Sequence, residues 1–292
     1  MKVVCPSFSG IYEPNVEIRQ FPDGDSYVRV PNAKEAMGKN AILFTRLYPN
    51  QDSAIFQTLL VLRALRENKA RSITLVVPYL PYSRQDKTFK EGEVKSAEIL
   101  CETLREQGVS HLITFDCHFL KREGEFEYGG LKITNLSMNK EIIGRAREIA
   151  GGELEIMSPD EGANYLVKEF GGSSMKKVRA GYGEGEGAAG GEEGEIYRGI
   201  GKMEMEKDVG GKCVLIIDDM ISTGSTMLKA VENVKKGGAK KVICAATHGF
   251  FLKDSLKKLR EECEKVFVTD SIETEASEIS IKPAIEKALE QM

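Results

Sequence analysis

Short apolar runs alternate with stretches of helical periodicity along the first half of the chain. The runs with the length and composition of buried strands are residues 41–45, 73–77 and 111–115. Asp52 or Ser53 could cap a helix after the first run, and its apolar face comprises Ile55, Phe56, Leu59, Leu62 and Leu65. A second helix is predicted over residues 96–107. This alternation predicts an α/β fold with a mainly parallel sheet and helices on its faces.

The second half repeats this plan. It has predicted strands over residues 213–217 and 241–246, with a helix over residues 225–236 between them. Each half also carries a histidine just past its second strand, His118 and His248, so we interpret the halves as two copies of one unit. A polar turn at 135–139 precedes the helical stretch 140–149 and marks the boundary. The pattern predicts two domains, residues 1–137 and 138–280, and a closing helix over residues 281–292 that could complete the first.

Composition narrows the class of protein. The chain has 292 residues, of which 41% are hydrophobic and 29% charged, and its net charge is −4. This balance is typical of a globular protein and argues against a general nucleic-acid binder, which needs a basic surface. No apolar run approaches the length of a membrane helix, and the N-terminus begins as a strand without a signal-peptide pattern, so we expect a cytoplasmic protein. Six scattered cysteines predict buried free thiols.

The most informative segment is residues 214–226. A buried strand ends in Asp218 and Asp219, and a hydroxyl-rich turn follows, directly before a helix. We call this turn the hydroxyl loop; it consists of Ser222, Thr223, Gly224, Ser225 and Thr226. Open α/β folds bind ligands at the carboxyl ends of their strands, and a helix start offers N–H groups to a phosphate. The two carboxylates could hold sugar hydroxyls or a magnesium ion. The alternative is an ordinary strand-to-helix turn capped by one aspartate.

Four other segments place polar side chains near strand ends. Residues 21–25 precede a predicted strand at 27–30 and are typical of a plain turn. Residues 78–87 present Arg84, Gln85 and Lys87, which suit a polyphosphate but also a solvated loop. In residues 114–118, Asp116 could orient His118, which could contact a metal or a phosphate, although a lone histidine is usually structural. In residues 156–162, a predicted strand leads to Asp160 at its tip. The alternative is that these residues form only a type I turn.

One segment interrupts the alternation. Residues 181–194 are half glycine with acidic residues between, and such a composition cannot bury a core. The segment lies inside the second unit, just before the strand that leads to the two aspartates. We therefore predict a mobile lid rather than an interdomain linker. Residues 175–179, at its root, carry cations that could close over developing phosphate charge.

Taken together, these segments resemble the ribose-phosphate pyrophosphokinases, also called phosphoribosyl pyrophosphate synthetases, and the archaeal-type members in particular. The likeness covers nearly the whole chain, with the motifs in the family's order. Residues 218–226 are similar to the family's ribose-5-phosphate loop, which phosphoribosyltransferases share. Residues 81–86, Pro-Tyr-Ser-Arg-Gln-Asp, resemble the family's ATP-binding segment, which phosphoribosyltransferases do not need. Residues 7–17 leave little room for the helix that the family usually has there.

The resemblance implies a fold of two tandem type I phosphoribosyltransferase-like domains. It also implies a reaction in which the 1-hydroxyl of ribose 5-phosphate attacks the β-phosphorus of ATP and AMP leaves. The residues implied for ATP are Phe21, Asp23, Asp25, Arg84, Gln85 and Asp86. Those implied for ribose 5-phosphate are Asp218, Asp219, Ser222, Thr223, Gly224, Ser225 and Thr226.

The resemblance further assigns the metal and the catalytic groups. His118 and Asp160 match magnesium-associated positions, and Mg²⁺ is the implied cofactor. Lys177 and Arg179 match a catalytic Lys-x-Arg pair, although Lys176 is adjacent to Lys177 and the assignment could shift by one. The family also implies a homo-oligomer, a dimer or larger, with no nucleic-acid or membrane partner. Two alternatives stay open: a non-catalytic homologue that binds synthetases, and a true phosphoribosyltransferase.

Overall fold

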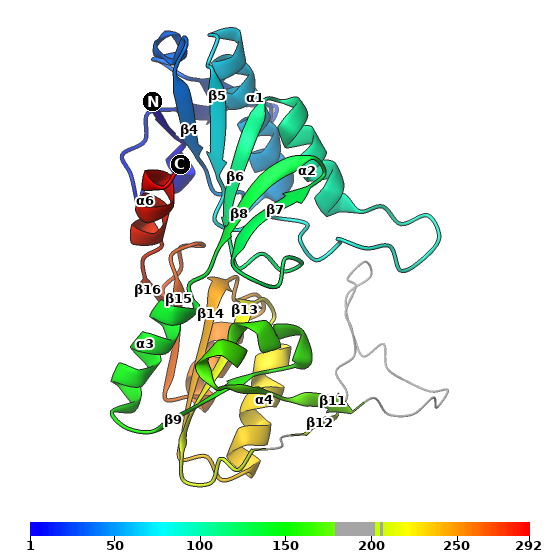
Figure 1. Cartoon of the computed structure of the whole chain (residues 1–292), viewed down its shortest axis with the longest axis vertical. Coiled ribbons are helices and arrows are strands. Elements are labelled where there is room, and N and C mark those ends of the chain that lie inside the picture. The colour runs from blue at the N-terminus through cyan, green and yellow to red at the C-terminus, as the bar shows by residue number, and fades with distance from the viewer. Residues whose placement is uncertain (179–201, 205–206) are drawn as a thin grey trace. The chain divides into compact units, whose positions relative to one another are not determined.

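The computed structural model describes residues 1–178, 202–204 and 207–292. Contacts within these residues divide the chain into two compact units. The first unit comprises Met1–Met138 together with Thr269–Met292, and the second comprises Asn139–Val268. Each has strands and helices in alternation, as Figure 1 shows along the colour gradient. The predicted domain boundary after residue 137, as a division of function, stays a prediction. Residues 269–280, which were assigned to the second domain, group with the first unit.

The sheet of the first unit confirms the predicted α/β architecture. Its strand order is β1-β4-β5-β6-β8-β7, and all neighbouring pairs are parallel except the hairpin of β7 and β8. The strands are β1 (Lys2–Val4), β4 (Asn40–Phe44), β5 (Ser72–Val76), β6 (Val109–Phe115), β7 (Gly124–Tyr128) and β8 (Leu131–Leu136). Helices α1 (Gln51–Glu67) and α2 (Ser96–Glu106) connect β4 to β5 and β5 to β6. Because parallel strands need such crossovers, the alternation along the sequence was a sound guide.

Helix α1 corrects two details of the prediction. It begins at Gln51, after Asn50 in the left-handed conformation, so Asp52 and Ser53 lie in the first turn and cap nothing. Its buried stripe is Thr58, Val61, Leu62 and Leu65, which follow the helical spacing of three and four. Phe56 lies off this stripe, and 57% of its surface is exposed. Its assignment to the apolar face was therefore wrong.

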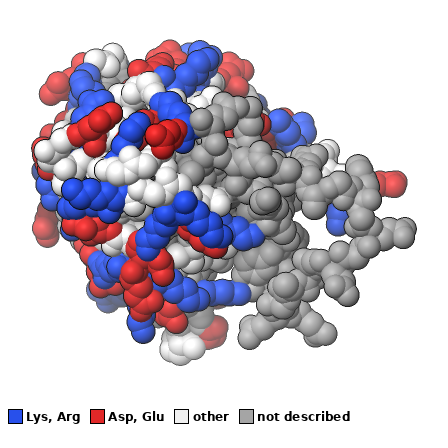
Figure 2. All heavy atoms as spheres, turned by 90° about the horizontal axis from the view of Figure 1, so that it is seen from below, with Lys and Arg blue, Asp and Glu red and all other residues white. Residues whose placement is uncertain are grey.

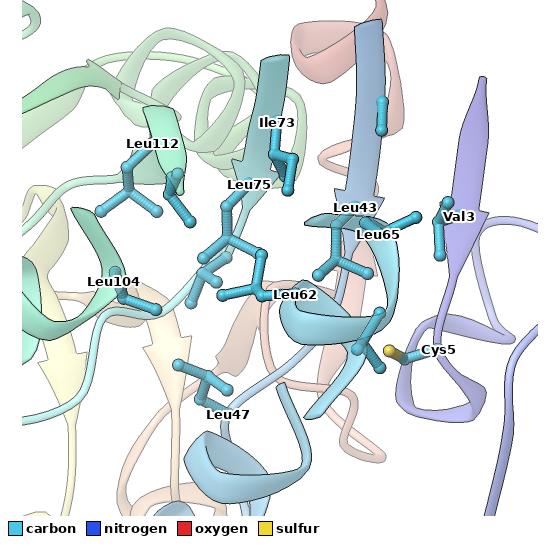
Figure 3. Close-up of a cluster of buried hydrophobic side chains, with 14 of the residues drawn as sticks. Val3, Cys5, Leu43, Leu47, Leu62, Leu65, Ile73, Leu75, Leu104 and Leu112 are labelled. Carbon is cyan, nitrogen blue, oxygen red and sulfur yellow. The ribbon is translucent and has the colours of Figure 1, made fainter. Parts of the chain in front are cut away.

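The core of the first unit lies between α1 and the sheet. Figure 3 shows Leu62 and Leu65 beside Leu43 and Leu75 of the central strands, and Val3 and Cys5 lie at the edge of the same cluster. Five of the six cysteine thiols are buried, as their apolar neighbourhoods predicted, and Cys263 is half-buried. The cluster fixes β4 and β5 and so positions the loops at their carboxyl ends.

The second unit is built around longer strands than the sequence suggested. Its strands belong to a sheet with the order β10-β9-β13-β14-β15-β16, and the last of these, β16, lies in the residues that group with the first unit. These strands are β9 (Leu154–Ser158), β10 (Ser173–Ser174), β13 (Cys213–Ile221), β14 (Lys241–Gly249), β15 (Lys265–Thr269) and β16 (Ser277–Ile279). The helices in this half of the chain are, in order, α3 (Asn139–Ala150), α4 (Ser225–Lys236), α5 (Ser255–Glu262) and the closing α6 (Lys282–Glu290). Helix α6 groups with the first unit.

The longer strands overturn one sequence argument. The order β13, α4, β14, α5, β15 matches the order β4, α1, β5, α2, β6. His118 follows β6, whereas His248 lies within β14, so the two histidines do not occupy equivalent positions. The repeated plan of strands and helices holds, and the histidine match does not.

Two small hairpins lie outside the two large sheets, and short 3-10 helices cover Ala33–Ala36, Glu161–Leu166 and Lys168–Phe170. Strands β2 (Glu17–Gln20) and β3 (Ser26–Arg29) pair antiparallel, so the strand predicted at 27–30 begins one residue earlier. Strands β11 (Lys176–Val178) and β12 (Lys202–Glu204) pair antiparallel in the second unit. Between β1 and β2 the structure has only a short 3-10 turn, Pro6–Phe8, within the stretch predicted to be too short for a helix. In the described part of the chain, no helix has the length and hydrophobicity to cross a membrane.

Candidate active site

The hydroxyl loop joins β13 to α4 at the carboxyl end of the sheet. Gly224 is buried and takes a left-handed conformation, with φ 72°, and α4 begins at the next residue. No side chain caps this helix start. Among the described residues, the N–H groups of Thr223, Gly224 and Ser225 have no acceptor. The turn therefore presents successive unpaired donors, which is how helix starts bind phosphate.

Three carboxylates gather beside this loop. Strands β9 and β13 are parallel neighbours, with Met157 opposite Ile216, so Asp160 and Asp218 follow at the same edge. Burial, and then the charges of Asp219 and Asp160, raise the pKa of Asp218 well above its usual value. The backbone N–H of Asp219 donates to Asp218 Oδ1 at 2.9 Å, and Asp219 is 4% exposed. Such a cluster favours a ligand that brings hydroxyl donors or positive charge.

The strand assignment of these aspartates differs from the prediction. Both lie inside β13, which continues to Ile221, rather than after the strand. Neither of them caps α4, because Gly224 occupies the N-cap position. The alternative of an ordinary turn capped by aspartate is therefore wrong.

The two predicted magnesium ligands lie in different units. Asp160 follows β9 in the second unit, and His118 follows β6 in the first. Within the residues that the structure describes, no three His, Cys, Asp or Glu side chains form a ready metal site. Magnesium is usually held by one or two carboxylates, waters and substrate phosphates, so Asp160 and its neighbours fit it. The imidazole of His118 suits softer metals better.

His118 sits after a tightly held bend. Asp116 is 2% exposed and has a left-handed φ of 35°. Its Oδ2 accepts a hydrogen bond from the Met138 N–H at 3.0 Å, and the Cys117 N–H donates to Asn135 Oδ1 at 2.9 Å. These bonds from the end of β8 fix where the chain turns, and His118 follows half-buried. That Asp116 orients His118 stays a prediction.

Residues 21–25, which include the predicted ATP-binding residues Phe21, Asp23 and Asp25, form the tip of the hairpin of β2 and β3. The Phe21 N–H donates to Asp25 O at 2.8 Å, and the Asp25 N–H donates to Asp23 Oδ1 at 3.2 Å. Phe21 is 51% exposed, and its ring packs edge-on against the ring of Tyr27, with 6.0 Å between the two ring centroids. The turn is thus as predicted, and it leaves a large aromatic face uncovered.

The predicted ATP segment follows β5 and is anchored by hydrogen bonds to neighbouring elements. Ser96 Oγ donates to Gln85 Oε1 at 2.7 Å, and the Ala97 N–H donates to Gln85 O at 3.3 Å, so α2 holds this residue. The Tyr128 hydroxyl donates to Asp86 O at 3.3 Å. Arg84 is exposed. The segment combines a fixed amide with a solvent-facing guanidinium, which suits recognition of a phosphate.

The predicted catalytic pair is only partly described. Lys177 lies in β11, where its backbone pairs with Met203 of β12. Arg179 and the glycine-rich residues 181–194 lie outside the described residues. The sequence also missed residues 250–255, whose backbone contacts the hydroxyl loop. A helix start at Asp254-Ser255 was the only local signal there.

The charges on one face are mixed. Figure 2 shows Lys and Arg side chains among Asp and Glu side chains over the coloured residues of that face. Among the residues drawn in colour, neither sign forms a continuous field, in keeping with the net charge of −4. The coloured residues of this face therefore form no long-range basic surface.

Comparison with known proteins agrees with this geometry. Residues 165–286 match the model of the phosphoribosyl transferase domain, and residues 5–108 match the N-terminal domain of ribose phosphate pyrophosphokinase. A crystal structure of phosphoribosylpyrophosphate synthetase from Mycobacterium smegmatis superposes with a TM-score of 0.79 and 23% identity, covering 99% of this chain and 97% of that one. The chain therefore has the fold of that synthetase and carries a phosphoribosyl transferase domain in its second half.

Curated relatives narrow this assignment further. The ribose-phosphate pyrophosphokinase of Pyrococcus furiosus is 36% identical over 93% of this chain and 91% of its own length. That of Thermococcus kodakarensis is 35% identical, with 93% and 91% covered. The chain belongs to the ribose-phosphate pyrophosphokinase family.

Proposed function

We propose that this chain transfers the β,γ-diphosphoryl group of ATP to the 1-hydroxyl of ribose 5-phosphate. The hydroxyl oxygen forms a bond to the β-phosphorus, the bond from that phosphorus to the α,β-bridging oxygen breaks, and AMP leaves. The hydroxyl proton passes to solvent. The products are 5-phospho-α-D-ribose 1-diphosphate and AMP. Such a transfer depends on positioning and charge neutralisation rather than on a covalent enzyme intermediate.

The observation that carries the proposal is the row of unpaired N–H groups beside buried carboxylates. Thr223, Gly224 and Ser225 offer donors that suit the 5-phosphate. Asp218 and Asp219 offer acceptors that suit the 2- and 3-hydroxyls of the ribose. The side chains of Ser222 and Thr226 supply further hydroxyls to the phosphate. One short segment thus supplies a donor set at one end and an acceptor set at the other, which matches a sugar phosphate.

The residues that we propose to bind ATP lie in the first unit. Phe21 would stack on adenine, and Asp23 and Asp25 would accept from the nucleoside. Arg84, Gln85 and Asp86 would bind the polyphosphate side. Magnesium, when bound, would neutralise phosphate charge and orient the diphosphoryl group, with Asp160 among its ligands. His118 would contact phosphate, and Lys177 and Arg179 would stabilise charge in the transition state. A homo-oligomer, a dimer or larger, also stays a prediction.

The test is the identity of the nucleotide product. The protein is incubated with ATP, Mg²⁺ and ribose 5-phosphate, and nucleotides are separated by chromatography. AMP and phosphoribosyl pyrophosphate are expected in equal amounts. ADP as the product would indicate an ordinary kinase. No nucleotide change, together with ATP binding in calorimetry, would indicate a non-catalytic homologue.

A further inference from the structure

The start of the hydroxyl loop accepts hydrogen bonds from residues 250–255, which we call the bracing segment. The carbonyl oxygen of Ser222 accepts the Leu252 N–H at 3.0 Å and the Ser255 hydroxyl at 3.2 Å. The Ile221 oxygen just before it accepts the Phe250 N–H at 2.9 Å. Two successive carbonyl groups at the start of the loop are therefore fixed by one short stretch of chain.

The bracing segment achieves this with an unusual backbone. Phe251, Lys253 and Asp254 all have positive φ values, of 50°, 55° and 58°. Residues other than glycine rarely adopt this left-handed conformation, and the surrounding structure must compensate where they do. The sharp bend allows the Leu252 N–H and the Ser255 hydroxyl to reach the same acceptor. Strain concentrated beside a ligand-binding loop is a common feature of functional sites.

The segment also contacts the loop through side chains. A Cβ atom added to Gly224 would lie 2.7 Å from Ser255 Cβ and 3.6 Å from Leu259 Cδ1. Ser255 and Leu259 are both fully buried. The absence of a side chain at Gly224 thus lets α5 approach the loop closely, and α5 in turn limits how the loop can move.

We propose that Ser255 is a positioning residue for ribose 5-phosphate, a role that rests on the proposed function. The C=O and N–H groups of one peptide bond point in opposite directions. Because Leu252 and Ser255 hold the Ser222 carbonyl, the Thr223 N–H is directed away from the bracing segment, toward the open side of the loop. Ser255 touches no substrate. It sets the direction of the first backbone donor offered to the 5-phosphate.

The first experiment compares steady-state constants for Ser255→Ala. Loss of one donor to Ser222 is expected to raise the KM for ribose 5-phosphate about fivefold, while the ATP KM and kcat stay near wild type. The control is Ser277→Ala, because the Ser277 hydroxyl also donates to carbonyl groups, those of Thr269 and Ile272, in the first unit. It is expected to lower the melting temperature similarly without changing either KM. An unchanged ribose 5-phosphate KM in Ser255→Ala would overturn the proposal.

The second experiment uses a compensating pair. Gly224→Ala is expected to weaken ribose 5-phosphate use strongly, because its new methyl group meets Ser255 Cβ and because a side chain at this left-handed φ is strained. Adding Ser255→Gly removes the clash but also the hydroxyl donor to Ser222, so the double variant should recover in kcat/KM for ribose 5-phosphate relative to Gly224→Ala alone and still stay at least about fivefold below wild type. A purely structural role predicts that the second change weakens the protein further. No recovery would contradict the assigned contact.

Both experiments separate this inference from the proposed function. Release of AMP by the wild-type protein tests the function alone. If AMP is not released, calorimetric binding of ribose 5-phosphate to wild type and Ser255→Ala still measures the positioning effect. An approximately fivefold weaker binding constant in the variant would support the inference without turnover, and equal constants would refute it.

Discussion

The hydroxyl loop after β13 and the hairpin tip between β2 and β3 are built in opposite ways. In the loop, Gly224 is buried, the Ser222 carbonyl has two donors, and Asp219 is 4% exposed. At the hairpin tip, Phe21 is 51% exposed, and hydrogen bonds among residues 20–25 of the same hairpin close the turn. The first geometry is present before any ligand arrives, whereas the second offers an uncovered aromatic surface. Substitutions should therefore act through geometry in the loop and through lost contact area at the tip.

The largest expected effect is at Asp219. Asp219→Asn keeps the shape of this buried side chain but removes its charge, so it loses a charge-assisted hydrogen bond to the ribose. We expect kcat/KM for ribose 5-phosphate to fall about 100-fold, with little change in the ATP KM. Steady-state kinetics with each substrate varied in turn gives both constants. A larger change in the ATP constant would place Asp219 on the other substrate.

The next effect is at Arg84 in the first unit. Arg84→Ala removes an exposed cation that we assign to the ATP phosphates, so the ATP KM should rise about tenfold. The melting temperature should not change, because the side chain is exposed. The matched control is Arg63→Ala in the same unit, where Arg63 is also exposed and pairs with Glu67 across one helix turn. Equal effects of the two variants would remove Arg84 from the ATP site.

A smaller effect is expected at the hairpin tip. Phe21→Ala deletes the proposed adenine platform, and loss of base stacking should raise the ATP KM about fivefold. Because Phe21 is largely exposed, thermal unfolding should be nearly unchanged. GTP measured in parallel should show a similar loss, since stacking tolerates any base. If Phe21→Ala destabilised the fold instead, the tip would be a structural element rather than an open surface.

The smallest expected effect is a change in the melting temperature of the ligand-free protein, caused by substitution of Asp218. Burial and the neighbouring carboxylates raise the pKa of Asp218, so its ionised form opposes folding when no ligand is bound. Asp218→Asn should raise the melting temperature of the ligand-free protein by about 3 °C while lowering activity. The Asn oxygen can still accept the Asp219 N–H, so the backbone bond is kept. A lower melting temperature would show that Asp218 stabilises the free protein.

Much of the fold could be predicted from local pattern. Continuous apolar runs marked β4, β5, β6 and β13 because buried parallel strands are apolar on both faces. The hairpin of β7 and β8 was missed, since the residues of β7 alternate between half-buried and exposed and form no continuous apolar run. Strand β13 was predicted too short because its charged end is still hydrogen-bonded to β14.

The site was predicted less completely, for a physical reason. Asp218, Asp219 and Gly224 could be proposed as site residues because a strand end, a carboxylate pair and a glycine are local signals. The bracing segment could not be found in this way. Its role depends on contacts with residues about 30 positions earlier, and its left-handed residues Phe251, Lys253 and Asp254 are not glycines. Of the three, only the aspartate is a residue type enriched in this conformation, so the residue types gave little signal.

The central claim, attack of ribose 5-phosphate on the β-phosphorus, can be tested with ATP that carries oxygen-18 in its α,β-bridging position. Attack at the β-phosphorus breaks the bond between that phosphorus and the bridging oxygen, so the label should remain in AMP. Mass spectrometry of the separated products measures this directly. Label in the diphosphate product, with unlabelled AMP or an adenylylated sugar, would mean attack at the α-phosphorus and would contradict the account.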